Sequence, residues 1–303
     1  MNDSSLVQAS IAITSYRVLS PGIDSIGLRT NQLSVDNYDS PTAFKEVKEF
    51  IAASRINNWD ISSILSMADY YTDSMLLTFE KSSAEGNQEG KCWKLPSTLP
   101  LNMSLENALK RRRSVRHYTG DSISFAELGT IAEASAGVTA VQNVPDASGK
   151  EHPISLRSYS SGGGLYPASL YLVAISVTGL PSGVYRYDPN CRALISVYGS
   201  EIVGEVIEAI SVSDEQLNLA NASAVCMLVA APLRSMRKYG TRGLRFSLHE
   251  IGAISQNIHL VSTALGIGSV DCSSFDDAAL HLAMGFRDDI NLIADLIILG
   301  IPA

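Results

Sequence analysis

Three consecutive glycines, Gly162 to Gly164, form the stretch of this sequence that is best suited to hold a ligand. Serines precede them at Ser160 and Ser161, and an apolar, β-rich run follows over 170–175. Because glycine has no Cβ, the backbone N–H groups of such a loop can closely approach a flat or anionic ligand. The sequence therefore predicts a ligand cradle that leads into a buried strand. A flexible surface turn is the alternative interpretation.

Two basic clusters interrupt a chain whose net charge is −8. Five of its 23 Lys and Arg residues lie in 110–116, and five more lie in 234–245. The guanidinium of Arg presents a planar fork that matches phosphate oxygens. The first cluster holds the candidates for binding a phosphomonoester, which are Arg112, Arg113, Ser114 and Arg116. Two solvated helix faces would explain the same clusters.

The absence of two nucleotide-binding motifs reduces the number of possible ligands further. No Gly-x-x-x-x-Gly-Lys-Ser/Thr loop is present, and no Gly-x-Gly-x-x-Gly follows a predicted strand. A ligand with a single phosphate and an aromatic head group fits this pattern better than ATP or a tightly held dinucleotide.

The overall composition argues against several classes of protein. An acidic chain is a poor general binder of nucleic acid, and no apolar run reaches the length of a membrane span. The four cysteines have no zinc-ligand spacing and the five histidines are isolated, so neither a metal site nor disulfides are expected. The first residues lack the basic region of a secretory signal. We therefore expect a cytoplasmic protein with buried free thiols.

Helices and strands follow one another without a strict alternation, which is typical of an α+β fold. The clearest helix spans 247–265, where apolar residues recur every three or four positions. Capping residues predict two more helices, one behind Ser104 and one behind Ser124 with Glu127. Shorter helices are expected at 203–210, 214–219 and 275–284. Strands are expected at 170–176, 184–187, 193–198, 224–231 and 292–299, and a loop at 140–153.

Residues 1–100 contain no motif that indicates chemistry. Helices are expected from Pro41 to about 52 and over 61–74, and a strand over 75–79. A polar stretch at 82–91 then resembles a linker. We place a domain boundary near residue 100 and interpret 1–100 as an accessory region that contacts substrate or a partner.

Five motifs in the second part of the chain resemble, in order, those of the nitroreductase superfamily. They are the segments 112–120, 160–167, 184–189, 238–243 and 266–276. The second is similar to the Pro-Ser-Ala-Gly-Ala-Leu-Tyr-Pro signature of one branch, the SagB-type dehydrogenases. The resemblance covers residues 104–300. It implies a nitroreductase-like α+β fold with a mixed central sheet flanked by helices, which forms a homodimer that binds FMN at the subunit interface.

The resemblance also implies a role for each matching position. The FMN phosphate and ribityl chain would be held by Arg112, Arg113, Ser114 and Arg116. The isoalloxazine ring would lie against Ser161, Gly162 and Gly163, and its N5 edge would face Ser273 and Ser274. Two departures affect this scheme. Ser160 replaces the first Pro of the cradle motif, and Gly162 and Gly164 replace its two Ala. The late basic residues of nitroreductases are also missing, and Arg287 is the candidate to replace them.

Lys238 and Tyr239 resemble the catalytic Lys-Tyr pair of the peptide azoline oxidases in this branch. Oxidation of an azoline to a thiazole or oxazole removes a proton from one ring carbon and a hydride from its neighbour, and FMN accepts the hydride. The base is either a desolvated Lys238 or a Tyr239 phenolate stabilised by the Lys238 cation. The alternative is that both residues only form a loop before the helix at 247.

The expected partners follow from the same resemblance: an azoline-containing precursor peptide and the cyclodehydratase subunits that make azolines. Two other functions stay open, an NAD(P)H-dependent nitro or quinone reductase and a flavin-bound scaffold subunit. Outside the Lys-Tyr pair, Arg242 and Arg245 are expected to pair with acids, and Glu250 is interpreted as structural. Neither nucleic acid nor a membrane is an expected partner.

Overall fold

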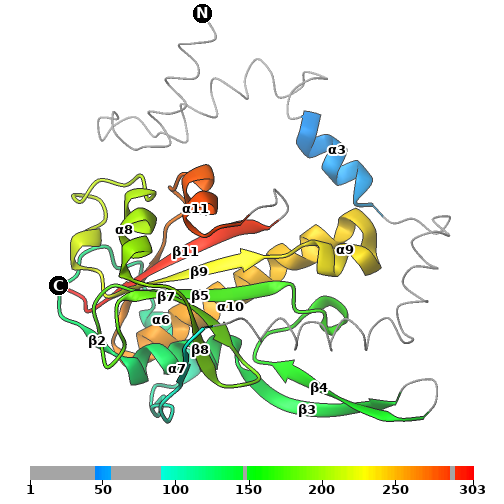
Figure 1. Ribbon diagram of the computed structural model, residues 1–303, viewed down its shortest axis with the longest axis horizontal. Helices are drawn as coiled ribbons and strands as arrows, with labels where there is room; N and C mark the ends of the chain where they lie inside the picture. Colours follow the sequence, from blue (N-terminus) through cyan, green and yellow to red (C-terminus); the bar gives the residue numbers. More distant parts are fainter. Residues whose placement is uncertain (1–44, 56–89, 146–148, 287–290) are drawn as a thin grey trace, which may run out of the picture.

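The computed structural model describes residues 45–55, 90–145, 149–286 and 291–303. Its centre is a seven-stranded sheet in the order β1-β8-β7-β5-β9-β11-β10 (Figure 1). The strands are β1 (Cys92–Lys94), β5 (Ala168–Ala174), β7 (Gly183–Asp188), β8 (Ala193–Tyr198), β9 (Ala224–Ala230), β10 (Gly268–Asp271) and β11 (Leu292–Gly300). The α+β class is confirmed. The boundary expected near residue 100 stays a prediction; β1, which precedes it, pairs with β8 at one edge of the sheet.

Every pairing in this central sheet is antiparallel, which corrects the expectation of a mixed sheet. The short turn between β7 and β8 illustrates the reason, because a chain that reverses within a few residues can only return antiparallel. A parallel pair does occur, but β2 (Ile123–Ser124) and β6 (Val177–Thr178) form it in a separate two-stranded sheet.

Helices cover both faces of the central sheet (Figure 1). On one face, α7 (Phe125–Ala136) and α10 (Gly243–Leu265) pack in a core that contains Leu172 of β5. On the other, α8 (Ser200–Glu208) and α11 (Asp277–Ala283) pack in a second core that contains Val173 of the same strand. Neighbouring residues of a strand point to opposite faces, so each strand between the layers contributes apolar side chains to both cores.

Capping residues begin the helices where the sequence predicts them. Ser104 accepts a hydrogen bond from Asn107 N at the start of α6 (Leu105–Arg111). Ser124 and Glu127 form the predicted capping box of α7. Asp276 accepts from Ala279 N and caps α11. These bonds satisfy N–H groups that have no partner within the first turn of a helix.

Several expected elements differ from those observed. The segment 140–153 is a β-hairpin of β3 (Val138–Pro145) and β4 (Glu151–Arg157) instead of a loop. The helix expected at 214–219 is a turn followed by the short 3-10 helix η2 (Leu219–Asn221). The stretch before 243 contains α9 (Leu233–Tyr239) and the 3-10 helix η3 (Gly240–Arg242). In the N-terminal part, α3 (Lys45–Ala53) matches the first expected helix, whereas the elements expected over 61–79 lie outside the described residues.

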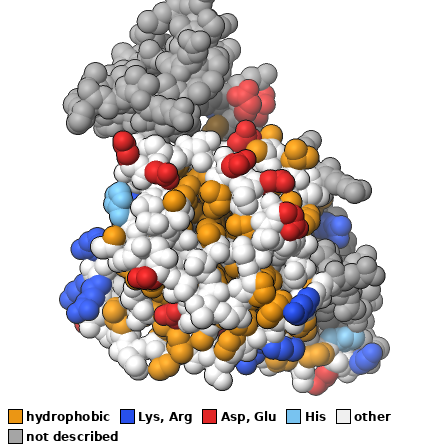
Figure 2. All heavy atoms as spheres, turned by 60° about the vertical axis from the view of Figure 1, so that its left-hand side comes forward, with side chains coloured by type: hydrophobic (Ala, Val, Ile, Leu, Met, Phe, Trp, Pro, Cys, Tyr) orange, Lys and Arg blue, Asp and Glu red, His pale blue; other side chains and the backbone are white. Residues whose placement is uncertain are grey.

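The surface carries its charge unevenly. Figure 2 shows acidic side chains gathered over α8 and α11, on the face of the sheet that is turned away from α10. They include the exposed residues Glu201, Glu205, Glu208, Asp276 and Asp277. Across the described ranges, no helix combines the length and apolar content that a membrane crossing needs.

The cysteines correct one expectation. All four are free thiols, but only Cys226 and Cys272 are buried, whereas Cys92 and Cys191 are exposed. Cys92 lies on β1, the strand at one edge of the central sheet.

Candidate active site

The glycine cradle, which we define as Ser161–Gly164, connects β4 to β5 and forms the short 3-10 helix η1 (Gly162–Gly164). Gly163 and Gly164 have φ angles of 68° and 66°. This left-handed conformation is readily available only to glycine. The Ser161 hydroxyl accepts a hydrogen bond from Tyr166 N at 2.9 Å and so closes the loop on itself. The cradle is therefore a fixed turn with bare backbone on its outside.

Helix α9 brings Lys238 and Tyr239 to this bare backbone. A Cβ added to Gly163 would lie 2.5 Å from Tyr239 Oη and 2.9 Å from Lys238 Nζ. A Cβ added to Gly162 would lie 3.2 Å from the ring of Phe246 on α10. The predicted cradle and the predicted Lys-Tyr pair thus meet in the folded chain, although about 75 residues separate them in sequence.

Lys238 is 1% exposed, and its Nζ lies 5.3 Å from the centre of the Tyr239 ring. Burial lowers the pKa of Lys238, because removal of water disfavours the ammonium form. The Tyr239 ring packs edge-on against Phe246 with 4.8 Å between the ring centres. The pair therefore combines a desolvated amine with a phenol that an aromatic neighbour holds in place.

Glu250, which the sequence led us to interpret as structural, also belongs to the site. It lies one turn beyond Phe246 on α10, is 1% exposed, and accepts a hydrogen bond at 2.5 Å from the Ser161 hydroxyl. Burial raises the pKa of Glu250 to about 7 and outweighs the lowering by Ser161, by Arg157 and by the amides of Gly162 and Ala168. The sequence did carry a signal for it, because Glu250 lies four residues before Ile254 on the buried face of α10, where a charged residue is unusual.

Two tyrosines and an arginine support the cradle from the side of β4. Arg157 donates a hydrogen bond to Tyr159 Oη at 2.9 Å, and its guanidinium carbon lies 4.5 Å from the centre of the Tyr166 ring. The Tyr159 and Tyr166 rings meet edge to face, 5.6 Å apart. Burial raises the pKa of Tyr159 to about 12, so this phenol stays neutral at physiological pH. The cluster fixes both ends of the loop that holds the cradle.

The predicted phosphate-binding segment follows α6 and runs beside β10. Val115 N donates to Ser269 O at 3.0 Å, and Ser114 forms a parallel bridge with Ser269. Arg113 donates to the carbonyl oxygens of Lys110 and Arg112, at 3.0 Å and 2.7 Å. Arg113, Ser114 and Arg116 are exposed and Arg112 is half-buried. The segment thus presents cationic and hydroxyl groups to the surroundings from a backbone that β10 holds in place.

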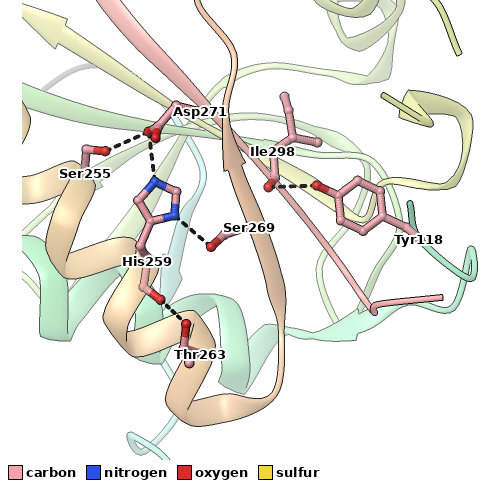
Figure 3. Close-up of polar contacts among 7 residues, drawn as sticks. All are labelled: Tyr118, Ser255, His259, Thr263, Ser269, Asp271 and Ile298. Atoms are coloured by element: carbon pink, nitrogen blue, oxygen red, sulfur yellow. Dashed lines mark hydrogen bonds and ion pairs between the residues drawn. The ribbon is translucent and has the colours of Figure 1, made fainter. Parts of the chain in front are cut away.

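A hydrogen-bond network lies behind this segment, between α10 and β10 (Figure 3). The buried His259 ring contacts Ser269 Oγ at 2.8 Å through Nδ1 and Asp271 Oδ1 at 2.9 Å through Nε2. Ser255, one turn earlier on α10, donates to the same Asp271 oxygen at 2.8 Å. Burial alone would raise the pKa of Asp271, but the hydrogen bonds that its carboxylate accepts and the proximity of His259 outweigh burial and lower the pKa to about 2. Among the described residues no His, Cys, Asp and Glu group is arranged to hold a metal ion.

The cradle and the arginine segment lie at different points along α10. Glu250 contacts the cradle and His259 contacts the strand beside the arginine segment. His259 comes nine positions after Glu250, a rise of about 14 Å along the helix. Ser273 and Ser274 follow β10, where the Ser274 carbonyl accepts from Ser211 N near the end of α8. Arg287 lies outside the described residues. The convergence of all these positions on one ligand stays a prediction.

Arg242 and Arg245 do not show the acidic partners that the sequence analysis expected. Arg242 donates to Ser54 O at 3.1 Å, and Arg245 donates to Ile51 O at 3.3 Å and also to the Ser54 hydroxyl. The last carbonyls of a helix have no partner within it and attract cations. In the described part of the chain, these two arginines therefore bind the C-terminal end of α3.

Comparisons with known proteins show which family the chain resembles. A family model described as "Nitroreductase family" matches residues 109–301. The protein named "Putative nitroreductase MJ1384" of Methanocaldococcus jannaschii is 33% identical over 186 residues, which cover 61% of this chain and 86% of that relative.

A second group of matches concerns microcin biosynthesis. The microcin B17-processing protein McbC of Escherichia coli is 28% identical over 147 residues, 47% of this chain and 52% of McbC, so the match spans about half of that relative. The solved E. coli microcin synthetase McbBCD complex, with truncated pro-MccB17 bound, contains a chain of the same fold (TM-score 0.53, 18% identity, 94% of this chain and 98% of that one). The structural match shows the fold, and the sequence match to McbC supports the SagB-type branch. Because the family model covers more than half of its residues, this chain belongs to the nitroreductase family of oxidoreductases.

Proposed function

We propose that this protein is an FMN-dependent dehydrogenase that oxidises azoline rings in a ribosomally made peptide to thiazoles or oxazoles. The observation that carries the proposal is the meeting of Lys238 and Tyr239 with the bare backbone of Gly163. A buried amine and a phenol beside a glycine turn are suited to removing a proton from a substrate ring that is bound next to that turn. The similarity to McbC supports a peptide substrate.

The residues present fit FMN. The two glycines let Phe246, Lys238 and Tyr239 approach the cradle backbone closely, because a Cβ at Gly162 or Gly163 would collide with these side chains, and the cradle thus places the Lys-Tyr pair beside the proposed ring site. Glu250 Oε2 is buried and makes no well-formed hydrogen bond within the described ranges, although the Gly162 and Ala168 amides act on the carboxyl group, and such an atom suits the neighbourhood of a ligand. Exposed Arg113 and Arg116 suit a phosphate. We propose that Arg112, Arg113, Ser114 and Arg116 hold the phosphate and ribityl chain, that Ser161, Gly162 and Gly163 support the flat ring, and that Ser273 and Ser274 line its edge.

The chemistry divides between cofactor and protein. Bound FMN would supply the hydride acceptor, and molecular oxygen would afterwards take up the two electrons. Lys238 and Tyr239 would take the proton from the neighbouring ring carbon, so that one proton and one hydride leave each ring. The lowered pKa of Lys238 favours a neutral amine that can act as the base, while a protonated Lys238 would favour the phenolate of Tyr239.

The proposal includes partners. The solved E. coli microcin synthetase McbBCD complex has truncated pro-MccB17 bound. By analogy we propose a cyclodehydratase as the source of the azoline-bearing peptide. We also propose a homodimer, because Leu105 and Leu109 form an exposed apolar pair on one face of α6, directly before the arginine segment.

Mass spectrometry of an azoline-bearing peptide tests the proposed reaction. The FMN-loaded protein should remove two hydrogens per ring in the presence of oxygen, and Lys238→Ala and Tyr239→Phe should each slow this loss by about 10²-fold or more. Absorbance near 450 nm, a property of oxidised flavin, shows whether each variant still holds FMN. An unchanged peptide mass with FMN bound and oxygen present would contradict the proposal.

A second candidate is an NAD(P)H-dependent nitro or quinone reductase, which the similarity to the M. jannaschii protein favours. Rapid bleaching of the bound flavin by NADPH, followed by reduction of a quinone, would support it. A third is a flavin-bound scaffold subunit, for which azole formation by a complete complex would not change in the Lys238→Ala and Tyr239→Phe variants.

A further inference from the structure

Glu250 is a buried carboxyl group for which the proposed mechanism has no use. It extends from α10 beneath the cradle and is 1% exposed. Its Oε1 accepts the Ser161 hydrogen bond, and the amides of Gly162 and Ala168 also lower its pKa, but its Oε2 makes no well-formed hydrogen bond with the residues described. An unsatisfied carboxylate oxygen in such a place is costly unless it carries a proton or meets a ligand.

Ser161 connects this carboxyl group to the cradle through two hydrogen bonds. Its hydroxyl donates to Glu250 and accepts from Tyr166 N, so both ends of the Ser161–Gly164 turn depend on it. Gly162 and Gly163 follow immediately and face Phe246, Tyr239 and Lys238. A change in the charge of Glu250 therefore acts directly on the backbone that would carry the ligand.

The other charged and titratable groups around Glu250 come from three elements. Arg157 from β4 lowers the pKa of Glu250, and Tyr159 from the loop after β4 stays neutral. Lys238 and Tyr239 from α9 face the opposite side of the cradle. His249, the neighbour of Glu250 on α10, is exposed. Of these groups, Glu250 is the one that both bonds to the cradle and titrates near neutral pH.

We propose that Glu250 is a positioning residue that keeps a proton beneath the glycine cradle, and that flavin binding at this site requires that proton. The proposal rests on the proposed flavin function and adds its regulation by pH. Glu250 is already buried, so its charge acts through the Ser161 hydrogen bond: an ionised carboxyl places an uncompensated negative charge one hydrogen bond away from the cradle that would carry the ligand. A protonated carboxyl is neutral and can donate a hydrogen bond, whereas an ionised carboxyl offers only acceptors and a negative charge.

The linkage between ligand binding and protonation of Glu250 determines whether the affinity rises or falls with pH. If the ligand prefers protonated Glu250, its binding raises the pKa of that group further, and the affinity falls as pH rises through about 7. One linked proton limits the fall to about tenfold per pH unit. Deprotonation of Lys238 would weaken the binding of an anion in the same direction, so the experiment has to separate the two groups.

The dissociation constant of riboflavin, measured by fluorescence between pH 6 and 8.5, tests the proposal. Riboflavin is the probe because it lacks the phosphate of FMN, which itself titrates near pH 6. The wild-type dissociation constant should rise by about tenfold or more across this range. In Glu250→Gln it should stay flat, since Gln keeps an acceptor for Ser161 and cannot ionise. Asp295→Asn is the matched control, because the pKa of Asp295 is also raised to about 7 but this residue lies on β11, and its slope should equal that of the wild type.

If Glu250→Gln does not fold, Ser161→Ala gives an independent test. The Ser161 hydrogen bond lowers the pKa of Glu250, so Ser161→Ala should move the midpoint of the pH dependence upward. An unchanged slope in Glu250→Gln, or an unchanged or lower midpoint in Ser161→Ala, overturns the proposal but leaves the proposed function standing. A wild-type protein that binds neither riboflavin nor FMN at any pH overturns both.

Discussion

Gly163 is the position in the cradle against which the side chains of Lys238 and Tyr239 lie. Its φ of 68° already excludes most residues, and the atoms in front of it exclude a Cβ for a second reason. The two reasons act on different properties. Backbone strain lowers stability wherever it occurs, whereas crowding of Tyr239 Oη and Lys238 Nζ changes only this site.

The Gly163→Ala variant separates these effects. Its backbone strain should cost about 1–2 kcal/mol of stability. Its Cβ should also displace Tyr239 or Lys238 and weaken FMN binding by at least about tenfold. Gly149→Ala is the control, because Gly149 has a φ of 84° and no atom within 4 Å of an added Cβ. It should lose similar stability and keep its FMN affinity, as measured by thermal unfolding and flavin fluorescence. Equal FMN affinity in both variants would place the ligand elsewhere.

At the scale of elements, α9 and α3 decide how the Lys-Tyr pair is held. Lys238 and Tyr239 occupy the last turn of α9, and Gly240 ends that helix with a φ of 54°. The arginines that bind the end of α3 come two and five residues later. The accessory helix is therefore attached to the same short segment that carries the proposed catalytic residues.

Arg245→Ala should release α3. Its bonds to Ser54 and Ile51 involve a charged donor, and such bonds are worth about 1.5–3 kcal/mol each. Hydrogen exchange in 45–55 should become faster by at least about tenfold, while the middle of α10 keeps its protection. Arg192→Ala, which removes an ion pair with Glu133 on another part of the surface, is the control. Unchanged exchange in 45–55 would mean that α3 is held by other contacts.

The elements that the sequence predicted well are those with a strong local signal. The apolar period of α10 and the capping box of α7 predicted two helices close to their observed bounds. The β3–β4 hairpin gave no such signal, because β3 is exposed over most of its length and its valines recur every third residue instead of every second. Helix α9 was missed because its seven residues are too few to establish a period.

In the site, too, the parts with a local sequence signal were predicted and the contacts between them were not. The glycine turn and the Lys-Tyr pair were predicted as separate segments, but their contact depends on the tertiary packing of α9 against α10. Glu250 was placed on a helix and not recognised as a part of the site, because nothing local to it indicates that Ser161 would be its partner. Likewise, Arg242 and Arg245 bind two backbone carbonyls and the Ser54 hydroxyl, and no sequence pattern marks these groups as partners of an arginine.

At the scale of the whole molecule, the two candidate ligand-binding regions lie along one helix, and the exposed leucines of α6 lie next to one of them. Leu105 and Leu109 are 66% and 54% exposed. A second copy of the chain that covers them would bring its own residues close to the arginine segment. This arrangement agrees with the homodimer that we propose.

The double variant Leu105→Glu, Leu109→Glu should therefore be monomeric. Sedimentation should give the wild type twice the chain mass of 32.5 kDa and the variant a single mass. The variant should also bind FMN at least about tenfold more weakly, because a site completed by the partner would be lost. Leu282→Glu is the control, since Leu282 is 83% exposed on α11, across the sheet from α10. A wild type that is monomeric with FMN bound would contradict the proposed dimer.

The β3–β4 hairpin stands apart from the central sheet and forms a two-stranded sheet of its own (Figure 1). Its second strand ends at Arg157, whose backbone N–H bonds to Tyr166 Oη and whose guanidinium lies against the Tyr166 ring. The hairpin is thus connected, through Arg157 and Tyr166, to the residues that flank the glycine turn. A molecule bound to β3 or β4 would therefore act on the same contacts that hold the proposed support of the flavin ring.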